Sequence, residues 1–297
     1  MAHKAFALLT ILIFVGLAST FIGAQQGTPV VGESPFTIDA DRIVIQVRFA
    51  GNGPYRMVLR TGASNSYVDA SFLSIVKKSG GALIPLSAIP EGVREVKARV
   101  GAQLKDLEIG SYRMNRTMAV LEDFNNMNLG EQRLSAPIHG MLGFNLLKGQ
   151  VVQIDYLQRV LRFLASSPYK KDDVRRGDAS RFTIPLRMSP VDYVPVVDEV
   201  YIGNKKIKAV LDTGYAGTLA LLPRGVKSLG LSTGTLPIIL TKIGMAAEIS
   251  LTPELVPDYA YESERFEAYD AVIGHAFLSN YVLTLDGKGK LVTLEKR

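Results

Sequence analysis

The 297-residue chain contains no cysteine and only three histidines. The absence of cysteine excludes disulfide bonds, thiolate zinc sites, iron–sulfur clusters and thiol nucleophiles. Charge of one sign is not concentrated either, since 34 basic and 28 acidic residues give a net charge of +6 that is spread along the chain. Nucleic-acid binding would need a basic stripe with interleaved aromatic residues, so we expect no nucleic acid partner. The composition, 47% hydrophobic and 21% charged, is typical of a globular protein.

Long hydrophobic runs are also missing, except at the N-terminus. Residues 1–24 combine a short basic start at His3 and Lys4 with an uncharged apolar run that begins at Ala5 and ends in the small residues Gly23-Ala24. This pattern is typical of an export signal, so we expect an exported protein, periplasmic or secreted. The run is also about as long as a helix that spans a bilayer, and an uncleaved membrane anchor stays open.

An internal repeat organises the rest of the chain. Residues 44–68 align without gaps with residues 196–220 at an offset of 152, and the matches include a Gly-Asn pair and a Thr-Gly pair in each copy. Met141-Leu142-Gly143 aligns with Val272-Ile273-Gly274 at an offset of 131, so the first copy carries 21 extra residues, which loops tolerate. The sequence therefore predicts three parts after the leader: an N-terminal lobe (37–166), a charged linker (167–180) and a C-terminal lobe (181–297).

Within each copy, the pattern is one of short strands separated by turns. Residues 43–49 alternate between apolar and polar side chains and are rich in β-branched residues, which is typical of a strand. Residues 51–54 have the composition of a turn, and residues 56–59 are predicted to form the next strand. Helical patterns are short, at 70–78 and 224–229. Strand pairs close both copies, at 151–155 with 160–163 and at 281–285 with 291–294. We therefore expect an all-β protein of two similar lobes.

The residues that point to a function are Leu211-Asp212-Thr213-Gly214, at the end of an apolar strand. An apolar-apolar-Gly segment with a following Leu278 lies about 60 residues later. This arrangement, present twice, resembles the aspartic peptidases, specifically retropepsin-like units fused in tandem as in the bilobal pepsin-like enzymes. The resemblance covers residues 36–164 and 182–295. It implies two retropepsin-like β-barrel lobes, an aspartic-type endopeptidase without cofactor or metal, and an extended peptide or unfolded protein as substrate.

In this family, two carboxylates from two lobes share one proton and activate a water molecule. The resemblance makes Asp212 a catalytic carboxylate. It gives Thr61 and Thr213 the role of gripping the opposite lobe, and it makes Gly62 and Gly214 the glycines that allow a tight turn beside the water.

The first copy departs from the family at one position. Where Asp212 stands in the second copy, the first has Arg60, within an otherwise matching Leu59-Arg60-Thr61-Gly62-Ala63-Ser64. We expect the Arg60 guanidinium to pair with Asp212 and to fill the space of the water, so that peptidase activity is impaired or absent.

Several alternatives stay open. Another carboxylate could replace the missing one, with Asp69, Glu122 and Asp123 as candidates. Two second lobes from different molecules could pair and rebuild a dyad from Asp212 alone, or the Arg60 substitution could be peculiar to this sequence within an active group. Asp212 could instead have a structural role, in a noncatalytic relative that binds a peptide or a partner protein in the cleft between the lobes.

Other polar residues have simpler structural interpretations. Asp155 and Asp286 recur in register, but an aspartate at a hairpin turn usually bonds its own backbone. His139 and His275 do not align with each other, and neither has the further residues that a metal site or a catalytic triad needs, so we expect packing or surface roles.

The sequence also offers two candidates for a flap that would close over substrate. Residues 93–110 predict two strands about Gly101, and residues 236–251 predict two strands about Gly244. Neither segment carries the aromatic-Gly pair of the family, and no substrate-binding residue is assigned to them.

Overall fold

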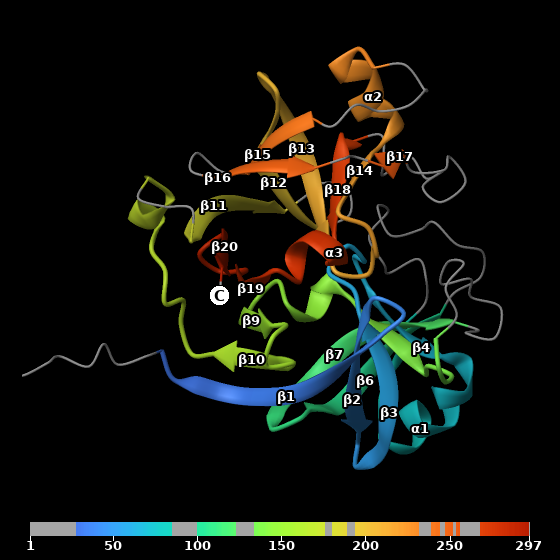
Figure 1. The fold of residues 1–297 in the computed structure, drawn as a ribbon. Helices are drawn as coiled ribbons and strands as arrows, with labels where there is room; N and C mark the ends of the chain where they lie inside the picture. The colour runs from blue at the N-terminus through green and yellow to red at the C-terminus, as the bar shows by residue number, and fades with distance from the viewer. Residues whose placement is uncertain are drawn as a thin grey trace, which may run out of the picture.

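Strands dominate the computed structural model, and the predicted all-β class is confirmed: the described residues form twenty strands and only short helices (Figure 1). None of the helices in this part of the chain is both long and apolar enough to cross a membrane. The leader lies outside the described residues, so the export signal stays a prediction. The structure describes residues 28–84, 100–122, 134–175, 180–188, 194–231, 239–243, 247–251, 254–255 and 268–296.

Six strands of the first half close into a barrel. The pairings run from β2 to β3, β8, β4, β7 and β6, and from β6 back to β2. The short β5 (Leu83–Ile84) adds to β6, and η1 (Ala70–Phe72) continues into α1 (Leu73–Lys78), where the helical pattern was predicted. The barrel strands are β2 (Arg42–Phe49), β3 (Asn52–Leu59), β4 (Ser66–Asp69), β6 (Val100–Ile109), β7 (Tyr112–Glu122) and β8 (Gly140–Leu142).

The second half repeats this arrangement. Its central feature is again a parallel pair, β13 with β18, that corresponds to β3 with β8. The helix α2 (Pro223–Leu229) follows β14 as η1 and α1 follow β4. The strands of this half are β12 (Pro195–Ile202), β13 (Lys205–Asp212), β14 (Leu219–Leu221), β15 (Ile239–Ile243), β16 (Ala247–Leu251), β17 (Glu254–Leu255) and β18 (Ala271–Gly274).

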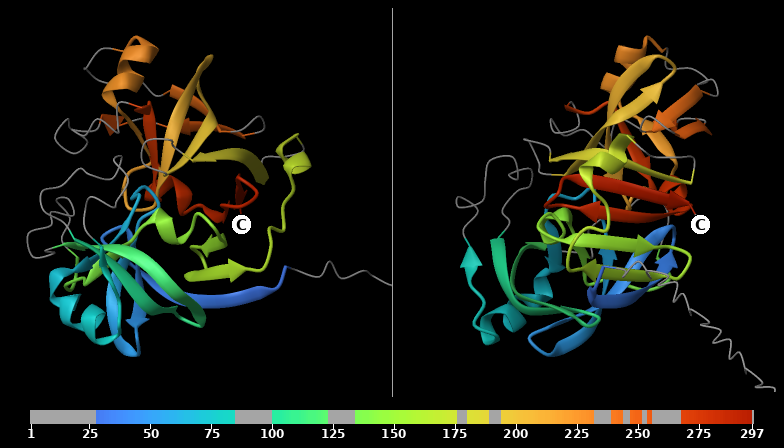
Figure 2. Two further views of the ribbon diagram at one scale, coloured as in Figure 1. Left: turned by 180° about the vertical axis from the view of Figure 1, so that it is seen from behind. Right: turned by 90° about the vertical axis from the view of Figure 1, so that its left-hand side faces the viewer.

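A six-stranded antiparallel sheet joins the two halves, and its middle strands lie side by side in the right-hand view of Figure 2. Gln153 of β9 lies opposite Thr284 of β19. These two residues are aligned positions of the repeat, so a local twofold axis passes between them. In spatial order the strands are β1 (Val30–Asp39), β10 (Val160–Leu164), β9 (Val151–Asp155), β19 (Tyr281–Asp286), β20 (Leu291–Lys296) and β11 (Arg181–Met188).

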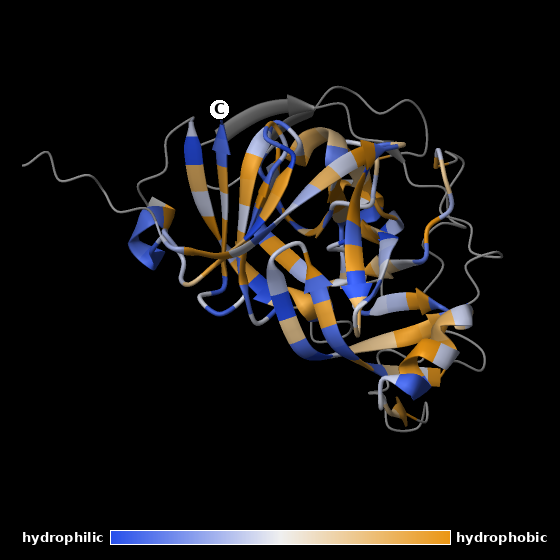
Figure 3. Cartoon of the chain, turned by 90° about the horizontal axis from the view of Figure 1, so that it is seen from below, coloured by the Kyte–Doolittle hydropathy of each residue, from blue (hydrophilic) through white to orange (hydrophobic). Residues whose placement is uncertain are grey.

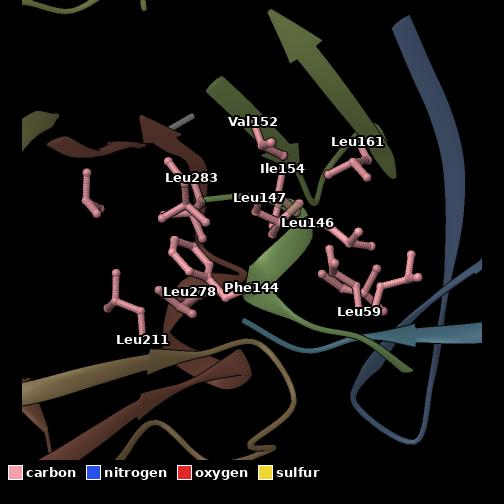
Figure 4. Packing of buried hydrophobic residues seen from close by; sticks show 14 of the residues in the cluster. Leu59, Phe144, Leu146, Leu147, Val152, Ile154, Leu161, Leu211, Leu278 and Leu283 are labelled. Atoms are coloured by element: carbon pink, nitrogen blue, oxygen red, sulfur yellow. The ribbon is translucent and has the colours of Figure 1, made fainter. Parts of the chain in front are cut away.

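The larger of two apolar clusters runs through both halves. Hydrophilic and hydrophobic residues alternate along many strands, as expected when one face of each strand is buried (Figure 3). Beneath the ends of β3 and β13, Leu59 and Leu211 belong to the same buried cluster as Phe144 of η4 (Phe144–Leu146) and Leu278 of α3 (His275–Leu278) (Figure 4). Each such side chain stabilises the fold by about 1.5–3 kcal/mol. The core therefore fixes where the two strands end.

Two predicted details of the first half are wrong. β3 already begins at Asn52, because Ala50 and Gly51 adopt positive φ values of 46° and 76° and complete the turn in fewer residues. The strand pair predicted to turn at Gly101 turns instead at Gly110, whose φ is 59°, while Gly101 lies inside β6 opposite Val120. Residues 93–99 of that candidate lie outside the described residues.

The second flap candidate has the predicted strands. β15 and β16 form an antiparallel pair on either side of residues 244–246, with Ile243 opposite Ala247. Within the predicted linker, the described residues include the short η5 (Lys171–Arg175). The domain boundaries and a flap role stay predictions.

Candidate functional site

The two repeated Thr-Gly loops meet where β3 and β13 end. β13 carries Asp212 as its last residue, and β3 ends one aligned position earlier, at Leu59. The Arg60 amide continues the parallel pairing by donating to the Leu142 carbonyl over 2.9 Å. Because β3–β8 and β13–β18 have the same local structure, each pair presents its loop to the local twofold axis.

Thr61 and Thr213 bind the two loops to each other through four reciprocal hydrogen bonds. The Thr61 hydroxyl donates to the Leu211 carbonyl (2.6 Å) and accepts from the Thr213 amide (3.0 Å). The Thr213 hydroxyl donates to the Leu59 carbonyl (2.9 Å) and accepts from the Thr61 amide (3.1 Å). Both threonines are completely buried. This closed set of bonds fixes the distance between the residues that precede them, Arg60 and Asp212.

Arg60 and Asp212 form an ion pair across this junction. Arg60 Nε and Nη2 both donate to Asp212 Oδ2 over 3.0 Å, and Nε also lies 3.3 Å from Oδ1. The Asp212 side chain is 3% exposed, whereas that of Arg60 is 30% exposed. The pair therefore buries its carboxylate and leaves part of the arginine side chain in contact with solvent.

Backbone amides of both loops bind the other side of the same carboxylate. The Gly214 amide donates to Asp212 Oδ1 over 2.8 Å, and the Gly62 amide reaches the same oxygen over 3.3 Å. Together with Arg60, these donors supply hydrogen bonds to both oxygens. A carboxylate with donors on both oxygens is held firmly in one orientation.

The glycines of the two loops make room for the opposite side chain. A Cβ atom on Gly62 would lie 2.4 Å from Asp212 Cγ, and a Cβ atom on Gly214 would lie 2.5 Å from Arg60 Cγ. Any larger residue at either position would displace the ion pair. Of the predicted site residues, the structure thus brings together all six: Arg60, Thr61, Gly62, Asp212, Thr213 and Gly214.

Two buried residues near this pair were missed by the sequence analysis. Arg42, at the start of β2, is 7% exposed and donates through Nη1 to the Ala40 carbonyl. Burial lowers the pKa of Arg42, and the charge of Arg60 lowers it further, while Asp212 acts in the opposite direction. Burial raises the pKa of Tyr156, and the charge of Asp212 adds to this effect. The only sequence signal was a charged or aromatic residue beside an apolar strand, which is too common to single out.

The structure describes two of the three candidate replacement carboxylates, Asp69 and Glu122. Asp69 accepts from the Ser71 amide over 2.9 Å and caps η1, and in the strand register it lies opposite Glu122. Asp123 lies outside the described residues. The surface through which a second copy could pair is occupied, since β9 and Thr61 of the same chain already contact β19 and Thr213.

The remaining polar candidates have structural roles. The interpretation of Asp155 and Asp286 as turn residues is confirmed, because they accept from the amides of Gln158 (3.0 Å) and Gly289 (2.6 Å). His139 Nδ1 accepts from the Arg56 amide over 3.2 Å. Within the described ranges, no group of three or more histidine, aspartate or glutamate residues is placed to hold a metal ion.

Comparisons with known proteins give a likeness to solved structures alone. No family model and no curated protein matches the chain. Among solved structures, the chain is similar to the crystal structure of an aspartic proteinase from Irpex lacteus, with a TM-score of 0.49 and 13% identity, over 89% of this chain and 97% of that one. We therefore infer the function from the contacts of the chain's own residues.

Proposed function

We propose that this protein is an aspartic-peptidase-like protein in which the Arg60–Asp212 ion pair disables hydrolysis, and that the junction between its lobes binds an extended peptide or an unfolded protein without cutting it. The observation that carries the proposal is the pair itself. It sits at the centre of a complete set of Thr61 and Thr213 bonds, at the position where the resemblance predicts two carboxylates.

The chemistry of the pair argues against hydrolysis. Activation of water by a carboxylate dyad needs one group that accepts a proton and a second that donates one. A guanidinium stays protonated under all physiological conditions, so Arg60 can do neither. Its Nε and Nη2 also occupy Asp212 Oδ2, the oxygen with no amide donor. The expected endopeptidase activity is therefore absent while Arg60 is in place.

The scaffold around the pair is nevertheless intact. The threonine bonds, the two glycines and the shared apolar core are all present, so the two halves are held in a fixed relation. An extended peptide can bind such a β-rich junction by adding a strand, which needs main-chain hydrogen bonds and no proton transfer. We accordingly propose a peptide as the partner, and an exported location if the predicted leader acts as a signal.

Restoring the missing acid tests the proposal. The wild-type chain, Arg60→Asp and the control R60D/D212N are incubated with a denatured protein substrate over a range of acidic pH, and new peptide ends are counted. We expect no cleavage by the wild type and Asp212-dependent cleavage by R60D with a bell-shaped pH profile. Cleavage by the wild type that disappears in Asp212→Asn would contradict the proposal and support an active endopeptidase.

Binding needs its own measurement. Fluorescence anisotropy with a library of labelled extended peptides should detect complexes with the wild-type protein. The variant T61V/T213V keeps Arg60 and Asp212 but loses the hydrogen bonds that fix the distance between them, so it should bind these peptides more weakly. If no peptide of the library binds, the proposed peptide binding is wrong, even if the proposed absence of hydrolysis is confirmed.

A further inference from the structure

A cavity of about 360 Å³ lies at the junction of the two halves. One wall comes from the turn that follows β9, and the other comes from α3 and the start of β19, elements that lie together in the centre of Figure 1. None of its lining residues belongs to the loops that carry Arg60 and Asp212. Its volume is at the lower end of the range for small-molecule sites.

The two halves of the repeat differ at the cavity. Tyr156 aligns with Gly287, and at the twofold-related place the Gly287 amide donates to the Gln150 carbonyl over 3.0 Å. A Cβ atom on Gly287 would lie 2.1 Å from the Lys148 carbonyl oxygen. The turn at Gly287 and residues 148–150 therefore contact each other through their backbones. A tyrosine cannot approach so closely, and on its side the Tyr156 ring contacts Phe36 and His275 instead.

Two buried polar atoms accompany this change. Tyr156 is 8% exposed and His275 is 6% exposed, and their rings contact each other edge to face with centroids 5.3 Å apart. Among the described residues, the Tyr156 hydroxyl and His275 Nδ1 have no hydrogen-bond partner. His275 aligns with Phe144, so an apolar ring serves the same packing role in the other half. Unpartnered buried polar atoms are costly and uncommon, and a bound polar molecule would supply the missing partners.

Arg159 supplies the positive charge at the cavity, while two carboxylates outside its wall, Asp41 and Asp212, act on His275 and Tyr156. Arg159 is exposed at the cavity and makes no ion pair with any described residue. The one carboxylate in the wall, Asp155, is already paired with Arg162 at 3.3 Å and accepts from the Gln158 amide. Leu157 adds an apolar surface that is 78% exposed. Arg159 can bind a carboxylate group, and Leu157 can contact a short hydrocarbon chain attached to it.

We infer that this cavity binds a small organic carboxylate. Arg159 holds the carboxylate, the Tyr156 hydroxyl and the His275 imidazole complete its hydrogen bonds, and Leu157 covers the hydrocarbon. Both residues line the cavity, but the Tyr156 hydroxyl and His275 Nδ1 are themselves buried, so the proposal requires each ring to change rotamer when the ligand binds. This site does not depend on the proposed peptide function.

Binding is tested on the full-length protein with sodium butyrate, and with butyramide as an uncharged probe of the same shape at the same ionic strength. We expect butyrate to shift the backbone NMR signals of Arg159, His275 and Asn280, and butyramide to leave them in place. Arg159→Ala should weaken butyrate binding about tenfold or more. Lys290→Ala is the matched control, because Lys290 is the residue that aligns with Arg159, and it should bind butyrate as the wild type does.

A further variant separates binding from folding. His275→Phe copies the residue found at position 144, so it should unfold at the wild-type temperature or above it and should lose butyrate binding. The inference is overturned if butyrate, hexanoate and benzoate all leave the three signals unchanged. It is equally overturned if butyramide binds as tightly as butyrate, or if R159A or H275F binds like the wild type.

Discussion

Replacing Arg60 with methionine tests whether the ion pair stabilises the junction. Methionine keeps much of the hydrocarbon of Arg60 and removes its guanidinium, which leaves Asp212 with the amides of Gly62 and Gly214 as donors. A hydrogen bond to a charged group contributes about 1.5–3 kcal/mol, and Arg60 makes two good ones. Water reaches the exposed third of Arg60 and offsets part of this. We therefore expect a loss of about 2–3 kcal/mol in the free energy of unfolding.

The loss is measured by urea unfolding and by the melting temperature. For a chain of this size, 2–3 kcal/mol corresponds to a decrease of about 4–10 °C. Asp212→Asn and the double variant R60M/D212N complete a double-mutant cycle, in which the coupling should be at least about 1.5 kcal/mol. Arg187→Met is the control, since its pair with Asp198 spans 2.7 Å but leaves Arg187 73% exposed, and it should cost less than about 0.5 kcal/mol.

The outcome that refutes this reasoning is specific. If the free energy of unfolding of R60M lies within about 0.5 kcal/mol of the wild-type value, or if the double-mutant cycle gives no coupling energy, the ion pair contributes no more than a surface contact. The geometry would then not hold Asp212 in place, and the argument that Arg60 blocks a water molecule would lose its support.

Two further predictions concern the threonine bonds and His275. Thr61→Val removes a donor to the Leu211 carbonyl and an acceptor for the Thr213 amide, so chemical denaturation should show a decrease of about 2–4 kcal/mol in the free energy of unfolding. Thr213→Val should give the same decrease within about 1 kcal/mol, and Thr61→Ser, which keeps the hydroxyl, should give little of it. Unequal decreases for the two valine variants would contradict the twofold equivalence. Burial lowers the pKa of His275, so the stability that its neutral form contributes is complete above pH 6.5, its ordinary pKa, and falls as the pH decreases toward the folded-state value, by at most about 1.4 kcal/mol per pH unit. His275→Phe should lack this part of the pH dependence in unfolding experiments, and an identical profile in both proteins would show that another group is responsible.

The sequence predicted features that depend on neighbouring residues better than features that depend on contacts between distant residues. Alternation and turn residues predicted the strands, because these signals lie within a few neighbouring residues. The turn at Gly101 was wrong because a glycine is compatible with both a strand and a turn, and its φ value is set by the partner strand β7. Arg42 and Tyr156 were missed for a related reason: burial depends on what folds over a residue.

The sequence by itself determined that one unit occurs twice and that the second unit has Asp212 where the first has Arg60, because aligned residues of a repeat can be compared without coordinates. Only the tertiary structure decided that these two side chains contact each other, since a separation of 152 residues is closed by the core and by the threonine bonds. The cavity at Tyr156 is also a product of tertiary structure. It lies where a tyrosine takes the place of a glycine whose backbone, at the equivalent position, contacts the facing segment directly.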